Sequence, residues 1–403
     1  MESRVFRALI RQTTAAFIGK WLETPADDLQ LRDRYSPRQK VEREKEFELL
    51  LQKAPSSREE YDRLSKDDRA RIRARVRGML GRALSSPGNA SATQFFDDCE
   101  HAGDALIQQA GEFDPGLSEN DIHQALRNLW VFNSIQKTLG LSVVITPSSF
   151  AYSLLYPYTD NWLDAQDHSG AERASLVRWL TDRLEGLDPE VFDRRTEILA
   201  RLLGSIDHEY PRSTFPDVHS SLLAIHQAQR RALSLHEAAL GKDETVLLPL
   251  TFEKGGTSVL VDGFLVGGHL TPVQMEILFG YGVVLQLIDD LQDLDEDRAS
   301  GHSTVFARAA MEGALEKATT RLINYTQTVL ARLGDCSQEG MGQLEKVIGR
   351  SCFALIVEAV SRYSSLYSDN YLASIEEFVP VSLPYLRGLR KRMETSYRGA
   401  GGG

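Results

Sequence analysis

Apolar residues recur at three- and four-residue intervals along almost the whole chain, which is the spacing of one face of an α-helix. Runs in which β-branched and polar residues alternate, as in a strand, are nearly absent. Ser118 with Asp121 is typical of a helix start, and Thr271-Pro272 opens a helix that continues towards Asp297. The pattern predicts an all-α protein.

Glycines and turn-forming residues divide this pattern into segments. We expect glycines to end helices at Gly140, Gly170, Gly241, Gly301 and Gly334. Residues 57–84 are charge-rich, and the run at 85–93 has turn chemistry, so residues 1–90 are predicted to form a helical N-terminal extension. Residues 91–397 then form the main bundle, followed by a Gly-rich tail at 398–403 that is expected to be disordered.

The net charge and the cysteine content limit which binding partners and which cellular compartment suit the chain. The formal net charge of −11 argues against nucleic acid or an anionic membrane surface as the main partner, and an anionic substrate would need a local source of positive charge. Three scattered cysteines suit neither a disulfide framework nor a zinc site and fit a reducing cytoplasm. The sequence shows no secretory signal and no unbroken apolar run of about 20 residues, so no transmembrane segment is expected.

The strongest chemical signal is a set of acids at the end of a long apolar helix. Asp289, Asp293 and Asp297 are spaced i, i+4 and i+8, which places them on one helical face. Like charges on one face repel, so a cation is expected there. Mg²⁺ is the natural candidate because it prefers oxygen ligands and binds through one or two carboxylates together with substrate phosphates.

A second acid pair ends another apolar, aromatic-rich stretch. Asp160 and Asp164 lie one helical turn apart, 129 residues before the first of the other acids. Acid runs at helix ends are usually solvated surface, and we assign the similar runs at 27–28 and 97–98 to the surface because no long apolar run precedes them. Two acid pairs that each end an apolar helix instead suit one cavity, with metal and diphosphate at its mouth and hydrocarbon inside.

These runs resemble motifs of the class I isoprenoid synthases. The segment Leu285-Gln-Leu-Ile-Asp-Asp-Leu-Gln-Asp293 resembles the second aspartate-rich motif of trans-isoprenyl diphosphate synthases, and a similar run occurs in squalene and phytoene synthases. The spacing 289, 293, 297 also looks like the metal-binding triad of terpene cyclases, and Asp160-Asn-Trp-Leu-Asp164 resembles the first motif, with Asn in second place. The resemblance covers roughly residues 141–367.

The resemblance implies a helical bundle with a central hydrophobic active-site cavity. It also implies that Asp160, Asp164, Asp289, Asp293 and Asp297 hold three Mg²⁺ ions and that an allylic isoprenyl diphosphate is ionised between the two acid helices. A dry pocket would protect the cation, and we expect two or three aromatic residues to line it, from the set Phe150, Tyr152, Tyr156, Trp162, Phe252, Phe264 and Phe279. A bulky residue at the position of Tyr156 limits chain length in elongating relatives, so the expected substrate has about fifteen to twenty carbons.

The branch of the superfamily depends on weaker features. The sequence lacks the Gly-Gly-Lys and Arg-rich segments that hold isopentenyl diphosphate in chain-elongating relatives, and the Lys-Thr pair is altered at Lys254. Gly255-Gly256 would break a helix as in terpene cyclases, although a simple hinge fits equally well. Arg362-Tyr363 resembles the pair that binds diphosphate in cyclases. The candidates for a further diphosphate-sensing cation are Arg230, Arg231 and Lys242, none of them at a convincing distance from the second motif.

The first prediction is therefore a Mg²⁺-dependent terpene synthase that ionises, and cyclises, one allylic diphosphate. Chain elongation is the second choice and head-to-head coupling the third. A non-catalytic helical scaffold with acidic patches is the alternative from another class, and a di-iron bundle is disfavoured because neither acid run has a Glu-x-x-His spacing. A homodimer is compatible with the sequence, which does not determine the oligomeric state.

Overall fold

A computed structural model describes residues 3–52, 90–164, 169–236, 244–336 and 342–398, together with residues 63, 65 and 68. Every regular element in these ranges is helical, which confirms the predicted all-α class. The chain forms two compact units: residues 1–22, 97–286 and 329–342 make the first, and residues 23–96, 287–328 and 343–403 make the second. Residues 1–90 are thus shared between the two units.

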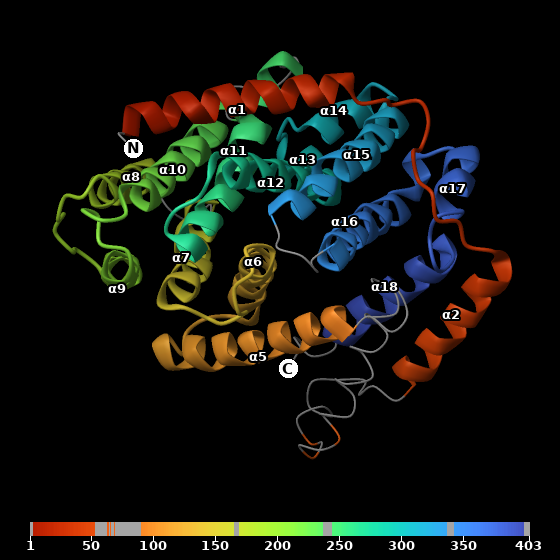
Figure 1. Ribbon diagram of the computed structural model, residues 1–403, viewed down its shortest axis with the longest axis horizontal. Helices are drawn as coiled ribbons and strands as arrows, with labels where there is room; N and C mark the ends of the chain where they lie inside the picture. The colour runs from red at the N-terminus through yellow and green to blue at the C-terminus, as the bar shows by residue number, and fades with distance from the viewer. Residues whose placement is uncertain are drawn as a thin grey trace. The chain divides into compact units, whose positions relative to one another are not determined.

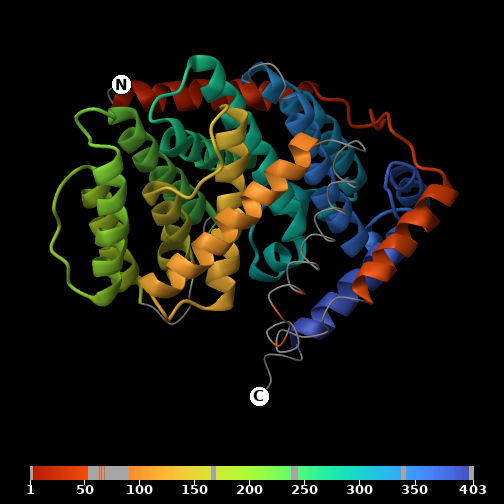
Figure 2. The ribbon, with the colours of Figure 1, turned by 60° about the horizontal axis from the view of Figure 1, so that its bottom comes forward.

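The first unit contains the first acid pair. Its helices, in chain order, are α1 (Ser3–Glu23), most of α5 (Ala90–Phe113), α6 (Glu119–Thr138), α7 (Pro147–Asp164), α8 (Gly170–Leu184), α9 (Arg194–Glu209), α10 (Pro216–His236), α11 (Glu244–Gly267), most of α12 (Pro272–Gln292) and the short 3-10 helix η1 (Ala331–Cys336). α7 packs against α6 and α9, while α10 packs against α8 and α11 (Figures 1 and 2). The acid pair therefore ends a helix that has neighbours on two sides.

The core of the first unit includes aromatic side chains from its N-terminal helix. Phe6, Phe17 and Trp21 project from α1 at helical spacing and are almost fully buried. Their rings lie 5.6–6.2 Å from those of three aromatic residues on α11 and α12, the partners being Phe264, Phe279 and Phe252 respectively. Fully burying a side chain of this size contributes about 1.5–3 kcal/mol, so α1 is an integral part of this core.

The second unit contains the second acid run. It comprises α2 (Pro37–Leu51), the end of α12, α13 (Leu294–Ser300), α14 (Val305–Met311), α15 (Leu315–Leu330), α16 (Gly342–Arg362), the short η2 (Ser364–Leu366), α17 (Asp369–Glu376) and α18 (Leu383–Arg398). Figures 1 and 2 show α2 running beside α18. Arg392 of α18 pairs with Glu48 of α2 at 2.7 Å, and the rings of Phe47 and Tyr385 meet edge to face.

Some of the residues predicted to start or end helices do so in the structure, and others do not. Ser118 caps α6 in a reciprocal capping box with Asp121, as predicted, and Gly140 and Gly301 adopt the positive φ of helix-terminating glycines. Gly170 was expected to end a helix, but it begins α8, because Ser169 and Glu172 form a second capping box. Gly241 and residues 399–403 of the tail lie outside the described residues, and Gly334 falls within η1.

No helix in the part of the chain that the structure describes is long and apolar enough to cross a membrane.

Candidate functional site

The second acid run lies where α12 passes into α13. Asp289 is in the last turn of α12, Asp293 is at the junction with φ −93° and ψ 14°, and Asp297 is in α13. The backbone amide of Asp293 donates to the carbonyl of Asp289, and that of Asp297 to the carbonyl of Asp293, both at 2.9 Å. Helical spacing therefore continues through the junction, and the three acids follow one another turn by turn, as predicted.

The carboxylates of this run are partly accessible to solvent. Asp289, Asp293 and Asp297 are all half-buried, and one carboxylate oxygen of Asp297 accepts a hydrogen bond from Thr304 at 3.0 Å. No group of three or more metal-ligating side chains comes together anywhere in the described ranges. Mg²⁺ typically binds through one or two carboxylates together with phosphate oxygens, and its binding at this run stays a prediction.

Arg362 and Tyr363 reach the end of α12 from about 70 residues away. The Arg362 guanidinium donates from Nη1 to the Gln292 carbonyl at 2.9 Å, and the Tyr363 hydroxyl donates to the same oxygen at 2.6 Å. Gln292 is the last residue of α12 and directly precedes Asp293. The structure therefore brings the Arg-Tyr pair to the backbone of the second acid run.

Glu358 is a member of this site that the sequence analysis missed. Its carboxylate accepts from Arg362 at 3.0 and 3.1 Å and from Arg390 of α18 at 2.6 Å, and the Gln292 side-chain amide lies 3.4 Å away. Burial alone would lower the pKa of Arg362, but the nearby carboxylate raises it above its ordinary value. The i, i+4 spacing of Glu358 and Arg362 was a readable signal, whereas nothing local marks Arg390.

The first acid pair lies at the end of α7, as expected. Asp160 and Asp164 are within this helix, so they are one turn apart, but their side chains and that of Tyr156 lie outside the described part of the structure. The first pair belongs to the first unit and the second run to the second unit. That the two runs share metal ions stays a prediction.

Side chains next to the first acid pair attach the end of α7 to its surroundings. The Tyr158 hydroxyl donates to the buried carboxylate of Asp114 at 2.7 Å, and Asp114 also accepts from Gly116 and from Arg194 of α9. The hydrogen bond from Tyr158 is the largest cause of the lowered pKa of Asp114. The guanidinium of Arg195 lies 4.1 Å from the ring centre of Trp162, between the two acid positions.

The other basic residues that the sequence offered as diphosphate ligands lie on α10 and α11 or outside the described residues. Arg231 of α10 donates to Glu253 of α11 at 2.6 Å, Arg230 is exposed, and Lys254 is half-buried. None of the contacts described for these three residues involves the acid runs. Lys242 lies outside the described residues.

The expected helix break at Gly255 and Gly256 is wrong. α11 is helical without interruption from Glu244 to Gly267. A Cβ atom on Gly255 would lie 2.7 Å from the Gly282 carbonyl of α12, and one on Gly256 would overlap the ring of Phe279. The glycines therefore allow two helices to approach closely, and the aromatic residues expected to line a pocket from these helices, Phe252, Phe264 and Phe279, are buried in the core.

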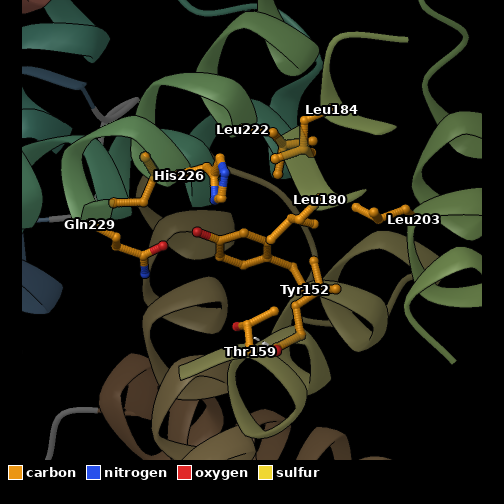
Figure 3. A pocket seen from close by; sticks show the side chains of 10 residues that line it. Tyr152, Thr159, Leu180, Leu184, Leu203, Leu222, His226 and Gln229 are labelled. Carbon is orange, nitrogen blue, oxygen red and sulfur yellow. Dashed lines mark hydrogen bonds between the residues drawn. The ribbon is translucent and has the colours of Figure 1, made fainter. Parts of the chain in front are cut away.

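A separate small cavity lies between α7, α8, α9 and α10. Its volume is about 50 Å³, and its walls combine leucines with a few polar groups: Tyr152, Leu155, Thr159, Leu180, Leu184, Leu203, Leu222, Ile225, His226 and Gln229. Figure 3 shows the Tyr152 hydroxyl directed towards His226 and Gln229. Burial lowers the pKa of His226 to about 4, so its ring is neutral near pH 7, and its Nε2 lies 2.9 Å from the Thr181 hydroxyl.

Three residues of α7 contribute to the wall of this cavity. Tyr152, Leu155 and Thr159 follow i, i+3, i+7 spacing along the helix. Of the aromatic residues expected to line a substrate pocket, Tyr152 lines this cavity. The large central cavity implied by the resemblance stays a prediction.

Comparison of the sequence with models of known protein families finds no match, and comparison with curated proteins finds none either.

Proposed function

We propose that the chain is a Mg²⁺-dependent class I isoprenoid synthase of the terpene synthase type, which ionises an allylic isoprenyl diphosphate. The observation that carries this proposal is the convergence of Arg362 and Tyr363 on the carbonyl of Gln292, next to Asp293. Two motifs that lie about 70 residues apart in the sequence are thereby adjacent in space. The pair satisfies the carbonyl at the end of α12, and it also places a guanidinium group beside the acid run.

The residues of the second run have separable roles in this proposal. Asp289, Asp293 and Asp297 are the proposed Mg²⁺ ligands of this run, and Asp160 and Asp164 are the proposed ligands of the first acid pair. When bound, the metal supplies positive charge that stabilises the departing diphosphate. Arg362 adds a charge-assisted hydrogen-bond donor to phosphate oxygens, and Tyr363 holds the end of α12 in place through the Gln292 carbonyl.

Incubation with single substrates tests this function and its branch. The purified protein is given Mg²⁺ and one allylic diphosphate of ten, fifteen or twenty carbons, first without and then with isopentenyl diphosphate, and released diphosphate and organic products are measured. We expect diphosphate release from the allylic substrate alone, with an extractable hydrocarbon or alcohol as product. A longer diphosphate that forms only with isopentenyl diphosphate would establish chain elongation instead.

A matched pair of variants links the activity to the acid run. Asp293→Ala is expected to lose most of the turnover while keeping the helical circular dichroism spectrum, because loss of one carboxylate from a repelling row does not destabilise the fold. Asp295→Ala is the control, since Asp295 is exposed and two residues off the acid face. Release of no diphosphate from any substrate with saturating Mg²⁺, or equal turnover in the two variants, would refute the proposal.

A further inference from the structure

The Glu358 carboxylate lies between two arginines beside the acid run. Glu358 of α16 accepts from Arg362 on its own helix and from Arg390 on α18, at distances of 2.6–3.1 Å. The side chains of Arg362, Glu358 and Arg390 are 29%, 33% and 34% exposed, respectively. The cluster is thus formed by well-placed hydrogen bonds but is still open to solvent.

Two guanidinium groups converge on the Glu358 carboxylate. One of them, that of Arg362, also donates to the Gln292 carbonyl, one residue before Asp293. A group with several negative charges that arrives together with Mg²⁺ would meet both arginines there, and a guanidinium pairs with phosphate oxygens through two parallel hydrogen bonds.

We propose that Arg390 is a second diphosphate-binding residue and that Glu358 is the counter-ion that holds Arg362 and Arg390 in position until diphosphate binds. This inference rests on the proposed function, because it assigns a diphosphate to the second acid run. It adds a residue from α18, whose sequence carries no recognisable motif. In this arrangement Glu358 competes with the ligand for the same two guanidinium groups.

The direction in which diphosphate affinity changes distinguishes a competing counter-ion from a purely structural ion pair. If the three charges only fastened α18 to α16, removal of either Glu358 or Arg390 would disturb the same contact, and both changes would weaken binding or leave it alone. If Glu358 is a competing counter-ion, removal of its charge strengthens diphosphate binding, whereas removal of the Arg390 charge weakens it. Partly exposed ion pairs contribute only about 0–1 kcal/mol to stability, so both variants are expected to fold.

Titration calorimetry with inorganic diphosphate and saturating Mg²⁺ measures these effects without turnover. We expect Arg390→Gln to weaken binding by about tenfold, or about 1.4 kcal/mol, and Glu358→Gln to tighten it severalfold. Arg392→Gln is the matched control: it is the same change two residues along α18, at a guanidinium that pairs with Glu48 instead. It should bind like the wild type. Arg390→Lys, which keeps the charge, should recover part of the loss.

The outcomes for this cluster and for the proposed function are distinguishable. Equal binding by the Arg390→Gln and Arg392→Gln variants, or weaker binding by Glu358→Gln, would overturn the inference even if the enzyme turns over an allylic diphosphate. Absence of wild-type binding to Mg²⁺ and diphosphate would overturn it as well. The predicted opposite shifts without turnover of any allylic substrate would support the diphosphate site and refute the synthase function.

Discussion

Replacement of Gly255 by alanine tests the close contact between α11 and α12. The new Cβ would lie 2.7 Å from the Gly282 carbonyl oxygen, about 0.7 Å inside the closest ordinary contact of 3.4 Å. It would also overlap the Cβ of Gln286. Both obstacles are backbone or backbone-anchored atoms, so no rotamer change relieves them and the helices must move apart.

The expected size of the effect follows from two opposing terms. Overpacking of this kind destabilises by about 1–3 kcal/mol, and a separation of 0.5–1 Å already removes about a quarter to a half of the dispersion energy of the contacting atoms. Alanine in a helix interior returns about 0.5–1 kcal/mol relative to glycine. Because Gly255 meets two fixed obstacles, we expect the upper part of the overpacking range and a net loss of about 2 kcal/mol in unfolding free energy.

Gly204 provides a control with the opposite sign. It lies within α9, and an added Cβ meets nothing within 4 Å, so Gly204→Ala should stabilise by about 0.5–1 kcal/mol. Urea unfolding followed by circular dichroism compares the two variants, and hydrogen exchange of the α11 and α12 amides locates the change. Equal stabilisation by both substitutions would refute the close contact and would return Gly255-Gly256 to the role of a helix hinge.

Two further predictions concern buried groups of the first unit. Tyr158→Phe removes the hydrogen-bond donor that most lowers the pKa of Asp114, so the pKa of Asp114 should rise. The unfolding free energy should fall by about 1.5–3 kcal/mol, because a hydrogen bond to a charged group is lost. NMR titration measures the pKa and chemical denaturation measures the stability; an unchanged Asp114 pKa would contradict the contact. Burial, and to a lesser extent Arg230, lowers the pKa of His226 in the folded protein from 6.5 to about 4. The folded state therefore keeps the ring neutral, and this stabilisation is complete above pH 6.5. It is lost as the pH falls towards 4, by up to about 3 kcal/mol. His226→Gln should therefore flatten the pH dependence of stability in that window, and an unchanged profile would show that the histidine is not buried as described.

Features that depend on neighbouring residues were readable from the sequence. The all-α class follows from periodicity, and the start of α6 follows from Ser118 and Asp121, three residues apart. Gly170 shows the limit of such signals. A glycine after a periodic segment is typical of a helix end, but the competing capping box of Ser169 and Glu172 starts a helix at the same place. Where two local signals conflict, the one that forms more hydrogen bonds determined the boundary.

Features that depend on distant residues were not readable. The aromatic residues of α1 have the spacing of any amphipathic helix, and nothing in residues 3–22 shows that their partners lie on α11 and α12. The same holds for Gly255-Gly256, because a pair of glycines suits both a helix break and a close helix contact. The carbonyl of Gly282 on the next helix distinguishes the two, because it lies 2.7 Å from where a Cβ atom on residue 255 would be.

The end of α12 is held by a contact from a distant part of the chain, which the local sequence does not indicate. Helices commonly end at a glycine with positive φ, whose amide satisfies the last carbonyl groups. No glycine follows Gln292, and its carbonyl is instead satisfied by Arg362 and Tyr363. The backbone that carries Asp293 is therefore attached to α16, and a change that displaces α16 should displace the acid run with it. The acids and the Arg-Tyr pair are two motifs in the sequence, but at Gln292 they form one structural element.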